Sequence, residues 1–271
     1  IALLAPEVRN NGVVVAQMGT VALAAGEAYT LQFDGKGLLS NVVVTPATMK
    51  ALVENGNAVQ APGGLIILSA QAASRLQGGI VNNTGSLQAS GLVKEGGRIL
   101  LRASDQINHS GSMQADAAPD SAGQGGNITL IADLNNPESV TRVSGSISAK
   151  GGVLGGDGGF IETSASHLGV SETAQISTAA PNGKGGEWLL DPADITISAS
   201  TDSGHTGFTP NSGAGASTVN TVTLVDALNN GNVTVTTANT GTSGSGAGNI
   251  TVSSEIAKTS STASTLTLTA N

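Results

Sequence analysis

A Gly-Gly step, or an equivalent pair, recurs along this chain and constrains its fold more than any other feature. The second residue of the step falls at Gly19, Gly64, Gly97, Gly126, Gly159 and Gly186, at intervals of 27 to 45 residues. Repeats with a period of roughly 20 to 50 residues indicate a solenoid or a similar array. Because a single repeat cannot bury its apolar face alone, we expect successive repeats to stack on one another.

Short apolar runs flank each step. The runs after it cover residues 21–23, 66–68, 99–101, 128–130, 161–163 and 188–190, and those before it cover 13–16, 59–61, 87–89, 113–115, 147–149 and 176–179. Their alternation and their β-branched residues favour strands over helices. The sequence therefore predicts an all-β parallel β-helix in which inward residues, such as Ile99 and Ile128, form stacked aliphatic ladders.

Asparagine and glycine are expected at the corners between strands. The phrases Asn10-Asn11-Gly12, Asn82-Asn83 and Asn182-Gly183 contain residues that tolerate left-handed backbone. The spacers before the Gly-Gly steps differ in length, as residues 89–96 and 115–125 illustrate. We expect these spacers to be loops that leave one corner without disturbing the stack.

The longest interval between steps contains an insertion near residues 28–54. The phrases YTLQF and LSNVVV flank Asp34-Gly35-Lys36-Gly37, which predicts a β-hairpin packed on the flank of the β-helix. Residues 46–54 start with Pro-Ala-Thr and continue with the apolar spacing of a short helix. The sequence predicts such a helix there.

The repeat changes character after residue 192, and this change predicts the domain organisation. Residues 1–192 are expected to form β-helix coils that include the insertion at 28–54, and residues 193–220 a polar, irregular stretch. Residues 221–271 are expected to add coils with a longer, irregular repeat, and a separate domain is the alternative. We expect one helical turn at 224–228 and strands within 248–256 and 264–271.

Composition excludes several classes of partner. The formal net charge is −8 with only 11 Lys plus Arg, which argues against binding to nucleic acid or to anionic membrane. No apolar run approaches the roughly 20 residues of a spanning helix. The chain contains no cysteine, which suits a secreted protein that crosses membranes unfolded. Because its first residues read as the second half of a repeat, we expect the chain to be an internal fragment of a longer protein.

Several phrases of this sequence resemble a known family. They are GTVALAAGEAYTLQFDGKGLLSNVVV at 19–44, IVNNTGSLQAS at 80–90, GGFIETSASHLGVS at 158–171 and NGKGGEWLLDPADITI at 182–197. In these phrases the chain resembles the filamentous-haemagglutinin-type exoproteins of bacterial two-partner secretion, large adhesins that include biofilm matrix adhesins. The phrase GGEWLLDPADITI is the most specific.

The resemblance implies a fold, a location and a partner. It implies a right-handed parallel β-helix in a long rod that is secreted, either extracellular or at the bacterial cell surface. Export would proceed through an outer-membrane β-barrel transporter. The Asn-Pro-Asn-Leu motif of the family's secretion domain is absent, so the resemblance places this segment in the stalk that follows that domain.

Two groups of residues have alternative interpretations. Trp188, the single tryptophan, is either a sugar-stacking platform or a core residue, and its place in the alternation favours the core. Asp157, Asp191 and Asp194 are either calcium ligands or turn residues. Turns are favoured because the surrounding residues lack the order of a calcium-binding repeat.

Arginine and histidine residues raise the question of catalysis. Arg98 and Arg102 alternate on the outer face of one strand, and the loop residues Asp116 and Asp120 could complete a cleft with them. A solvated flank is the favoured interpretation. The three histidines, His109, His167 and His205, lack metal-ligand spacing and are expected to be incidental.

Five Asn-x-Ser/Thr triplets could carry sugars, although such triplets arise often by chance in an Asn- and Thr-rich chain. Their asparagines are Asn82, Asn108, Asn127, Asn232 and Asn249.

The sequence leads to three functional hypotheses. The first is a structural and adhesive stalk segment for cell-cell or cell-surface attachment and biofilm formation, with contacts to exopolysaccharide, host glycans or neighbouring rods. The second is a specific carbohydrate- or host-ligand-binding module that uses the hairpin and loops. The third is a β-helical polysaccharide lyase or hydrolase. We expect no enzyme activity, cofactor or metal, and no ligand-binding residue can be named from the sequence.

Overall fold

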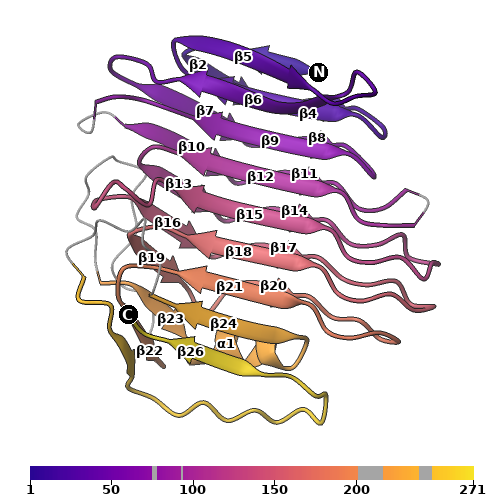
Figure 1. Cartoon of the computed structure of the whole chain (residues 1–271), viewed down its shortest axis with the longest axis vertical. Coiled ribbons are helices and arrows are strands. Elements are labelled where there is room, and N and C mark those ends of the chain that lie inside the picture. Colours follow the sequence, from indigo (N-terminus) through magenta and orange to yellow (C-terminus); the bar gives the residue numbers. More distant parts are fainter. Residues whose placement is uncertain (75–77, 93, 201–215, 238–245) are drawn as a thin grey trace.

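The computed structural model describes residues 1–74, 78–92, 94–200, 216–237 and 246–271. These residues form 26 strands and one helix, and most strands belong to three long sheets. Figure 1 shows the strands stacked one above another from the N-terminal end of the chain to the C-terminal end. The three sheets are entirely parallel, so the all-β parallel β-helix predicted from the repeats is confirmed.

We call the three parallel sheets A, B and C. Sheet A has the order β1 (Ala2–Leu4), β4 (Thr20–Ala25), β9 (Leu65–Ala70), β12 (Arg98–Ala103), β15 (Asn127–Ala132), β18 (Phe160–Ser164), β21 (Glu187–Asp191), β24 (Asn232–Thr236) and β26 (Leu266–Thr269). Sheet B has the order β2 (Glu7–Asn10), β7 (Ala51–Asn55), β10 (Gly79–Asn83), β13 (Gln106–His109), β16 (Val140–Val143), β19 (His167–Val170), β23 (Thr218–Asn220), β22 (Ile195–Ser198) and β25 (Ile250–Val252). Sheet C contains β3 (Val13–Val15), β8 (Ala58–Gln60), β11 (Ser86–Gln88), β14 (Ser112–Gln114), β17 (Ser146–Ser148) and β20 (Gln175–Ser177).

Each regular coil therefore has three strands, in the order A, B, C. The runs predicted after the Gly-Gly steps are the strands of sheet A, and those predicted before them are the strands of sheet C. The strands of sheet B were not predicted, except β25, which lies within the strand expected at 248–256. Two of the proposed corners lie within them, because Asn10 ends β2 and Asn82-Asn83 ends β10. Asn82-Asn83 is therefore not a corner, whereas Asn11-Gly12 lies between β2 and β3, as predicted. Among the described non-glycine residues only Met18 has a positive φ, so none of the asparagines adopts left-handed backbone.

The core consists of stacked aliphatic side chains, which explains how a chain with few aromatic residues folds. Along sheet A the inward positions hold Val21, Ile66, Ile99, Ile128, Ile161, Trp188 and Val233, and all seven are buried. Sheet C contributes Val59, Leu87, Met113, Ile147 and Ile176 to the same core. Burial of apolar surface is the main favourable term in folding.

Close packing between coils explains the Gly-Gly step. A Cβ atom on Gly126 would lie 2.0 Å from the carbonyl oxygen of Gly97, and one on Gly159 would lie 2.0 Å from that of Gly126. The first glycine of the step is equally enclosed, since a Cβ on Gly125 would lie 2.2 Å from the oxygen of Ala149. The recurring glycines therefore form a corner where successive backbones touch, which we call the glycine corner.

The spacer loops before the glycine corner form a layer of their own. Gly91 N donates to Asp116 O at 2.7 Å, Ala117 N to Lys150 O at 2.8 Å, and Gly151 N to Ala179 O at 2.9 Å. The loops leave the corner as expected, but they also hydrogen-bond to one another and extend side by side from one edge of the stack (Figure 1). We call residues 89–92, 94–97, 115–126, 149–159 and 178–186 the loop layer.

The predicted hairpin is confirmed, and the predicted helix after it is wrong. Strands β5 (Ala28–Phe33) and β6 (Leu39–Thr45) pair antiparallel around a turn in which Gly37 has a φ of 77°. Val42 of the hairpin packs on Ala22, Leu65 and Ile67 of sheet A. Residues 51–55 form β7 rather than a helix, because the backbone there pairs with the sheet B strands on both sides.

The C-terminal coils depart from the regular order. Helix α1 (Thr221–Leu228) lies between β23 and β24 in the chain, where the regular coils have a strand of sheet C. Its N-cap Asn220 accepts a hydrogen bond from Val222 N, and its residue Leu224 is buried in the core. The predicted turn at 224–228 is thus part of a longer helix. Within the stretch predicted to be irregular, residues 195–198 and 218–220 are strands of sheet B, and residues 201–215 lie outside the described residues.

Candidate binding trough at the glycine corner

Two adjoining hollows follow the glycine corner along the outside of the molecule. The larger has a volume of about 570 Å³ and the smaller about 310 Å³. Both are lined by Gly96, Gly97 and Arg98, so together they form one trough parallel to the axis of the stack. Volumes of this size are typical of sites for small ligands and short polymer segments.

The trough has a glycine floor and two walls. Its floor is made of the paired glycines at 96–97, 125–126, 158–159 and 185–186, which have no side chains to fill the space. The first wall consists of the first outward residues of β12, β15, β18, β21 and β24, namely Arg98, Asn127, Phe160, Glu187 and Asn232. The second wall consists of three residues of the loop layer, Gln124, Asp157 and Lys184.

The hairpin closes the N-terminal part of the trough. Asp34, Leu38, Leu39 and Ser40 of the hairpin line the smaller hollow opposite Arg98. The Asp34 carboxylate accepts hydrogen bonds from Leu38 N at 2.9 Å and Lys36 N at 2.8 Å. These backbone bonds lower the pKa of Asp34 and hold the turn in shape.

The trough contains both basic and acidic side chains, and its carboxylates accept hydrogen bonds within the protein. Arg98 and Lys184 contribute positive charge, and Asp34, Asp157 and Glu187 contribute negative charge. Asp157 Oδ1 accepts from Lys184 N at 2.8 Å, and Glu187 Oε1 accepts from Thr234 Oγ1 at 2.7 Å. The trough is therefore polar and close to neutral.

Asn127 has capacity for a further hydrogen bond. Its Oδ1 atom is buried and has no hydrogen-bond partner among the described residues. Asn127 lies beside Phe160 in the register of sheet A, and both side chains are half-buried. A ligand in the trough could reach this oxygen only after rotation of the Asn127 side chain.

The structure places the remaining predicted residues away from the trough. Trp188 is buried in the core, where its Nε1 atom donates to Thr163 Oγ1 at 3.1 Å, so the core interpretation is confirmed. Asp194 accepts from Asn249 N at 2.6 Å and from Ala247 N at 3.2 Å, which supports the turn interpretation. Asp191 is also buried. Among the described residues, no cluster of three or more histidine, aspartate or glutamate side chains could hold a metal ion.

Of the four residues considered for a catalytic cleft, only Arg98 lines the trough. Arg98 and Arg102 are both exposed on the outer face of β12, as predicted. Asp116 instead accepts hydrogen bonds from Lys150 N at 2.7 Å and Ser148 Oγ at 3.1 Å, and Asp120 is exposed. The carboxylate of Asp116 therefore stabilises the loop layer.

A second polar feature, inside the stack, was not foreseen. Asn10, Asn55, Asn83 and His109 occupy one inward column of sheet B, and all four side chains are buried. Asn10 Nδ2 donates to Asn55 Oδ1 at 2.7 Å, and Asn55 Nδ2 donates to Asn83 Oδ1 at 2.8 Å. We call these four residues the polar ladder.

His109 ends the polar ladder, so its description as incidental was wrong. Its Nδ1 atom lies 3.0 Å from Asn83 Nδ2, and its Nε2 atom lies 3.1 Å from Ser146 O. These partners require that Nδ1 accepts and that Nε2–H donates, which is the neutral imidazole. Burial lowers the pKa of His109 to about 4 and outweighs its hydrogen bonds, which act in the opposite direction. His167 separately donates to Pro137 O at 2.9 Å, and His205 lies outside the described residues.

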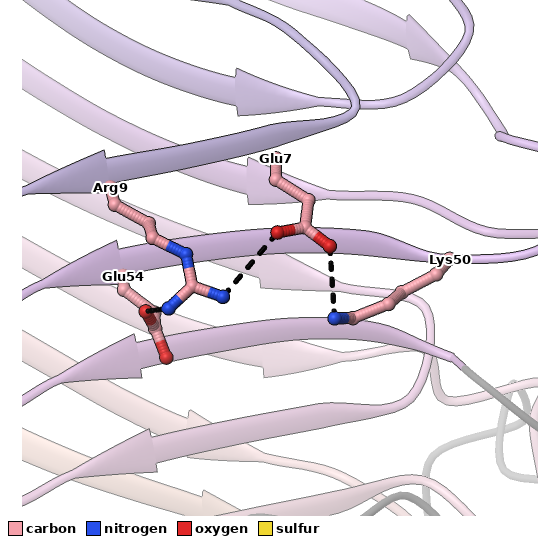
Figure 2. A network of polar contacts seen from close by, with 4 residues as sticks. All are labelled: Glu7, Arg9, Lys50 and Glu54. Carbon is pink, nitrogen blue, oxygen red and sulfur yellow. Dashed lines mark hydrogen bonds and ion pairs between the residues drawn. The ribbon is translucent and has the colours of Figure 1, made fainter.

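A network of four charges lies on the exposed outer side of β2 and β7 (Figure 2). Arg9 contacts Glu54 at 2.5 Å and Glu7 at 3.4 Å, and Lys50 contacts Glu7 at 2.9 Å. The hydrogen bond and charge of Lys50, followed by those of Arg9, lower the pKa of Glu7. Because the four charges cancel and are exposed, we assign the network a small stabilising role between two coils.

The potential glycosylation sites differ in accessibility. Asn82 and Asn108 are buried, and Asn108 Nδ2 donates to Asn82 Oδ1 at 2.8 Å, so neither amide is free to carry a sugar in this fold. Asn127 and Asn232 are half-buried in the wall of the trough, and Asn249 is exposed. Glycosylation of Asn249 stays a prediction.

No helix in the described part of the chain has both the length and the apolar character needed to cross a membrane. No protein-family model matches this sequence, and a search of the curated proteins finds no match either.

Proposed function

We propose that this chain is a structural and adhesive stalk segment of a large secreted bacterial adhesin, without enzymatic activity. One observation supports the proposal most directly: three parallel sheets continue from coil to coil around a single aliphatic core. Such a quasi-one-dimensional stack can position other parts of a protein at a distance. The sequence resemblance to two-partner secretion exoproteins and the lack of cysteine support secretion and export through an outer-membrane β-barrel transporter.

The stalk proposal is tested by shape and by attachment. Small-angle scattering of the purified chain should give an elongated particle, and beads that carry the chain should attach to surfaces coated with bacterial exopolysaccharide or host glycans. A compact particle in solution would contradict the rod. An elongated chain that attaches to no coated surface would limit its role to that of a spacer between other segments.

A specific binding module is the second candidate, and the trough favours it. The trough lies between the hairpin and the loop layer, which are the two parts named for this role from the sequence. The adhesive stalk and the binding module differ in one measurable respect. Saturable binding of one glycan that depends on trough residues supports the module, whereas weak binding to many polymers supports the stalk alone.

A further inference from the structure

We propose that the trough binds a neutral linear polysaccharide, which lies parallel to the axis with its pyranose rings over successive coils. This inference rests on the adhesive function proposed above and names its site and its ligand class. The first wall of the trough is contributed by five adjacent strands of sheet A. With neighbouring strands about 4.8 Å apart, the wall is about 19 Å long, enough for several sugar rings in a row.

The backbone of the trough argues against a peptide ligand. Extended peptides usually bind by adding a strand to a sheet edge that has free N–H and C=O groups. Here the wall backbone is used between coils, since Asn127 N donates to Gly97 O at 3.1 Å, Phe160 N to Gly126 O at 3.0 Å and Glu187 N to Gly159 O at 3.0 Å. A ligand must therefore be held by side chains.

The charges of the trough argue against a polyanion. The trough contains two basic residues, Arg98 and Lys184, and three carboxylates, Asp34, Asp157 and Glu187, and the whole chain has a net charge of −8. Nucleic acids and acidic polymers gain most of their affinity from uncompensated lysine and arginine residues. A neutral polymer is not repelled by the carboxylates of the trough. It can still use each charged side chain as a hydrogen-bond partner.

The side chains present suit the two kinds of surface on a pyranose ring. Phe160 occupies the middle of the first wall, where its ring can stack on the apolar C–H face of a sugar. Asn127 and Glu187 lie on either side of it in the register of sheet A, where amide and carboxylate groups can exchange hydrogen bonds with sugar hydroxyls. The glycine floor lets the polymer approach the backbone.

Calorimetric titration with β-1,4-linked glucose and mannose oligomers of increasing length tests the proposal on the whole chain. Affinity should rise with oligomer length until the oligomer spans the five strands, and then level off. An affinity that does not depend on length, or a preference for oligogalacturonate over the neutral oligomers, would overturn the assignment.

Two matched pairs of variants locate the site. Phe160→Ala should weaken binding by about tenfold, since loss of a stacked ring costs on the order of 1.4 kcal/mol. Phe33→Ala, which removes an exposed phenylalanine of the hairpin outside the trough, should leave binding unchanged. Likewise Arg98→Ala should weaken binding by several-fold, whereas Arg102→Ala on the same strand should not.

The failure of this proposal can be distinguished from that of the adhesive function. Equal binding by all four variants, with circular dichroism showing that they are folded, would place the glycan elsewhere on the rod and leave the adhesive function intact. Absence of binding to any neutral oligomer would overturn the site. The attachment of chain-coated beads to glycan surfaces would then decide the adhesive function independently.

Discussion

One interior column of sheet B is polar over its first four strands and apolar over the next three. The polar part consists of Asn10, Asn55, Asn83 and His109, and the apolar part of Val143, Val170 and Val219. All seven side chains are buried, and the backbone register continues through both parts. The difference lies in what joins one coil to the next: directional hydrogen bonds in the first part and non-directional packing in the second.

The comparison shows that the interior of a β-helix can be either polar or apolar. The two kinds of interior differ in how they respond to the loss of one contact. A valine column tolerates the loss of one contact, because its members act independently. In the polar ladder each donor requires the acceptor of the next coil, and a buried donor without a partner is costly. The last donor of the polar ladder, Asn83 Nδ2, also requires an acceptor. His109 accepts this hydrogen bond at Nδ1 and donates from Nε2 to Ser146 O.

The largest loss of stability should come from a charge placed in the aliphatic core, which runs through both the polar and the apolar part of the stack. We expect Ile128→Asp to destabilise the fold by about 4 kcal/mol or more, because the carboxylate would be buried without a partner. Denaturant unfolding followed by circular dichroism measures the loss. Ile131→Asp, on the outward side of the same strand, is the matched control and should cost little. A stable Ile128→Asp variant would show that the inward register is wrong.

The second test breaks the polar ladder itself. Asn55→Val removes the donor to Asn83 Oδ1 and one of the two acceptors of Asn10 Nδ2, which keeps its bond to Ala58 O, and should cost about 3 kcal/mol. Replacing Asn10, Asn55, Asn83 and His109 together by valine makes the first part resemble the second. We expect this fourfold variant to lose much less than the sum of the single losses, as measured by chemical unfolding. Strictly additive losses would mean that the ladder members act independently.

The third test asks whether the glycine corner is packed equally closely in the coils with the polar ladder and in the coils with the valine column. Gly64→Ala and Gly159→Ala should each cost about 3 kcal/mol, because a Cβ at either position would lie 2.0 Å from the carbonyl oxygen of the preceding corner. Thermal unfolding of the two variants should give similar losses. Gly35→Ala, in open space at the hairpin turn, serves as the control. A loss confined to one variant would indicate that the corner is not equivalent along the stack.

The smallest effect is expected from titration of His109, and it is limited to acidic solution. The pKa of His109 is lowered from 6.5 to about 4 in the folded chain, so as the pH falls the unfolded chain takes up the proton first. The stability that neutral His109 confers is complete above pH 6.5 and is lost as the pH falls towards 4, by at most on the order of 3 kcal/mol. Free energies of unfolding measured across this range for the natural chain and for His109→Asn should diverge by that amount. Parallel curves would contradict the assignment.

The sequence was sufficient to predict the parts of the fold that follow simple alternation. Ile99, Leu101 and their equivalents alternate with outward residues, and Gly97 and its equivalents mark the turn, so sheets A and C and the hairpin could be located. The first strands of sheet B were missed because Asn55, Asn83 and His109 point inward, which reverses the usual relation between polarity and exposure. Asn82-Asn83 was therefore interpreted as a corner, and residues 51–54 as part of a helix.

The trough could not be predicted because no local pattern contains it. Arg98, Asn127 and Phe160 are about 30 residues apart in sequence and become neighbours only through the register of sheet A. The opposite wall depends on the stacking of spacer loops of unequal length, and no sequence pattern predicts that such loops stack. A useful signal would have been the outward residue directly after each Gly-Gly step, since these residues align in every coil.

The order of strands in sheet B near the C-terminus has a consequence for the path of folding. Strand β22 (195–198) precedes β23 (218–220) in the chain, yet β23 lies between β19 and β22 in the sheet. The earlier coils can be added one at a time as the chain emerges, whereas here a gap beside β19 must wait for a segment synthesised later. A chain that emerges N-terminus first can therefore complete its regular coils progressively but can fill the place beside β19 only after β23 has been made.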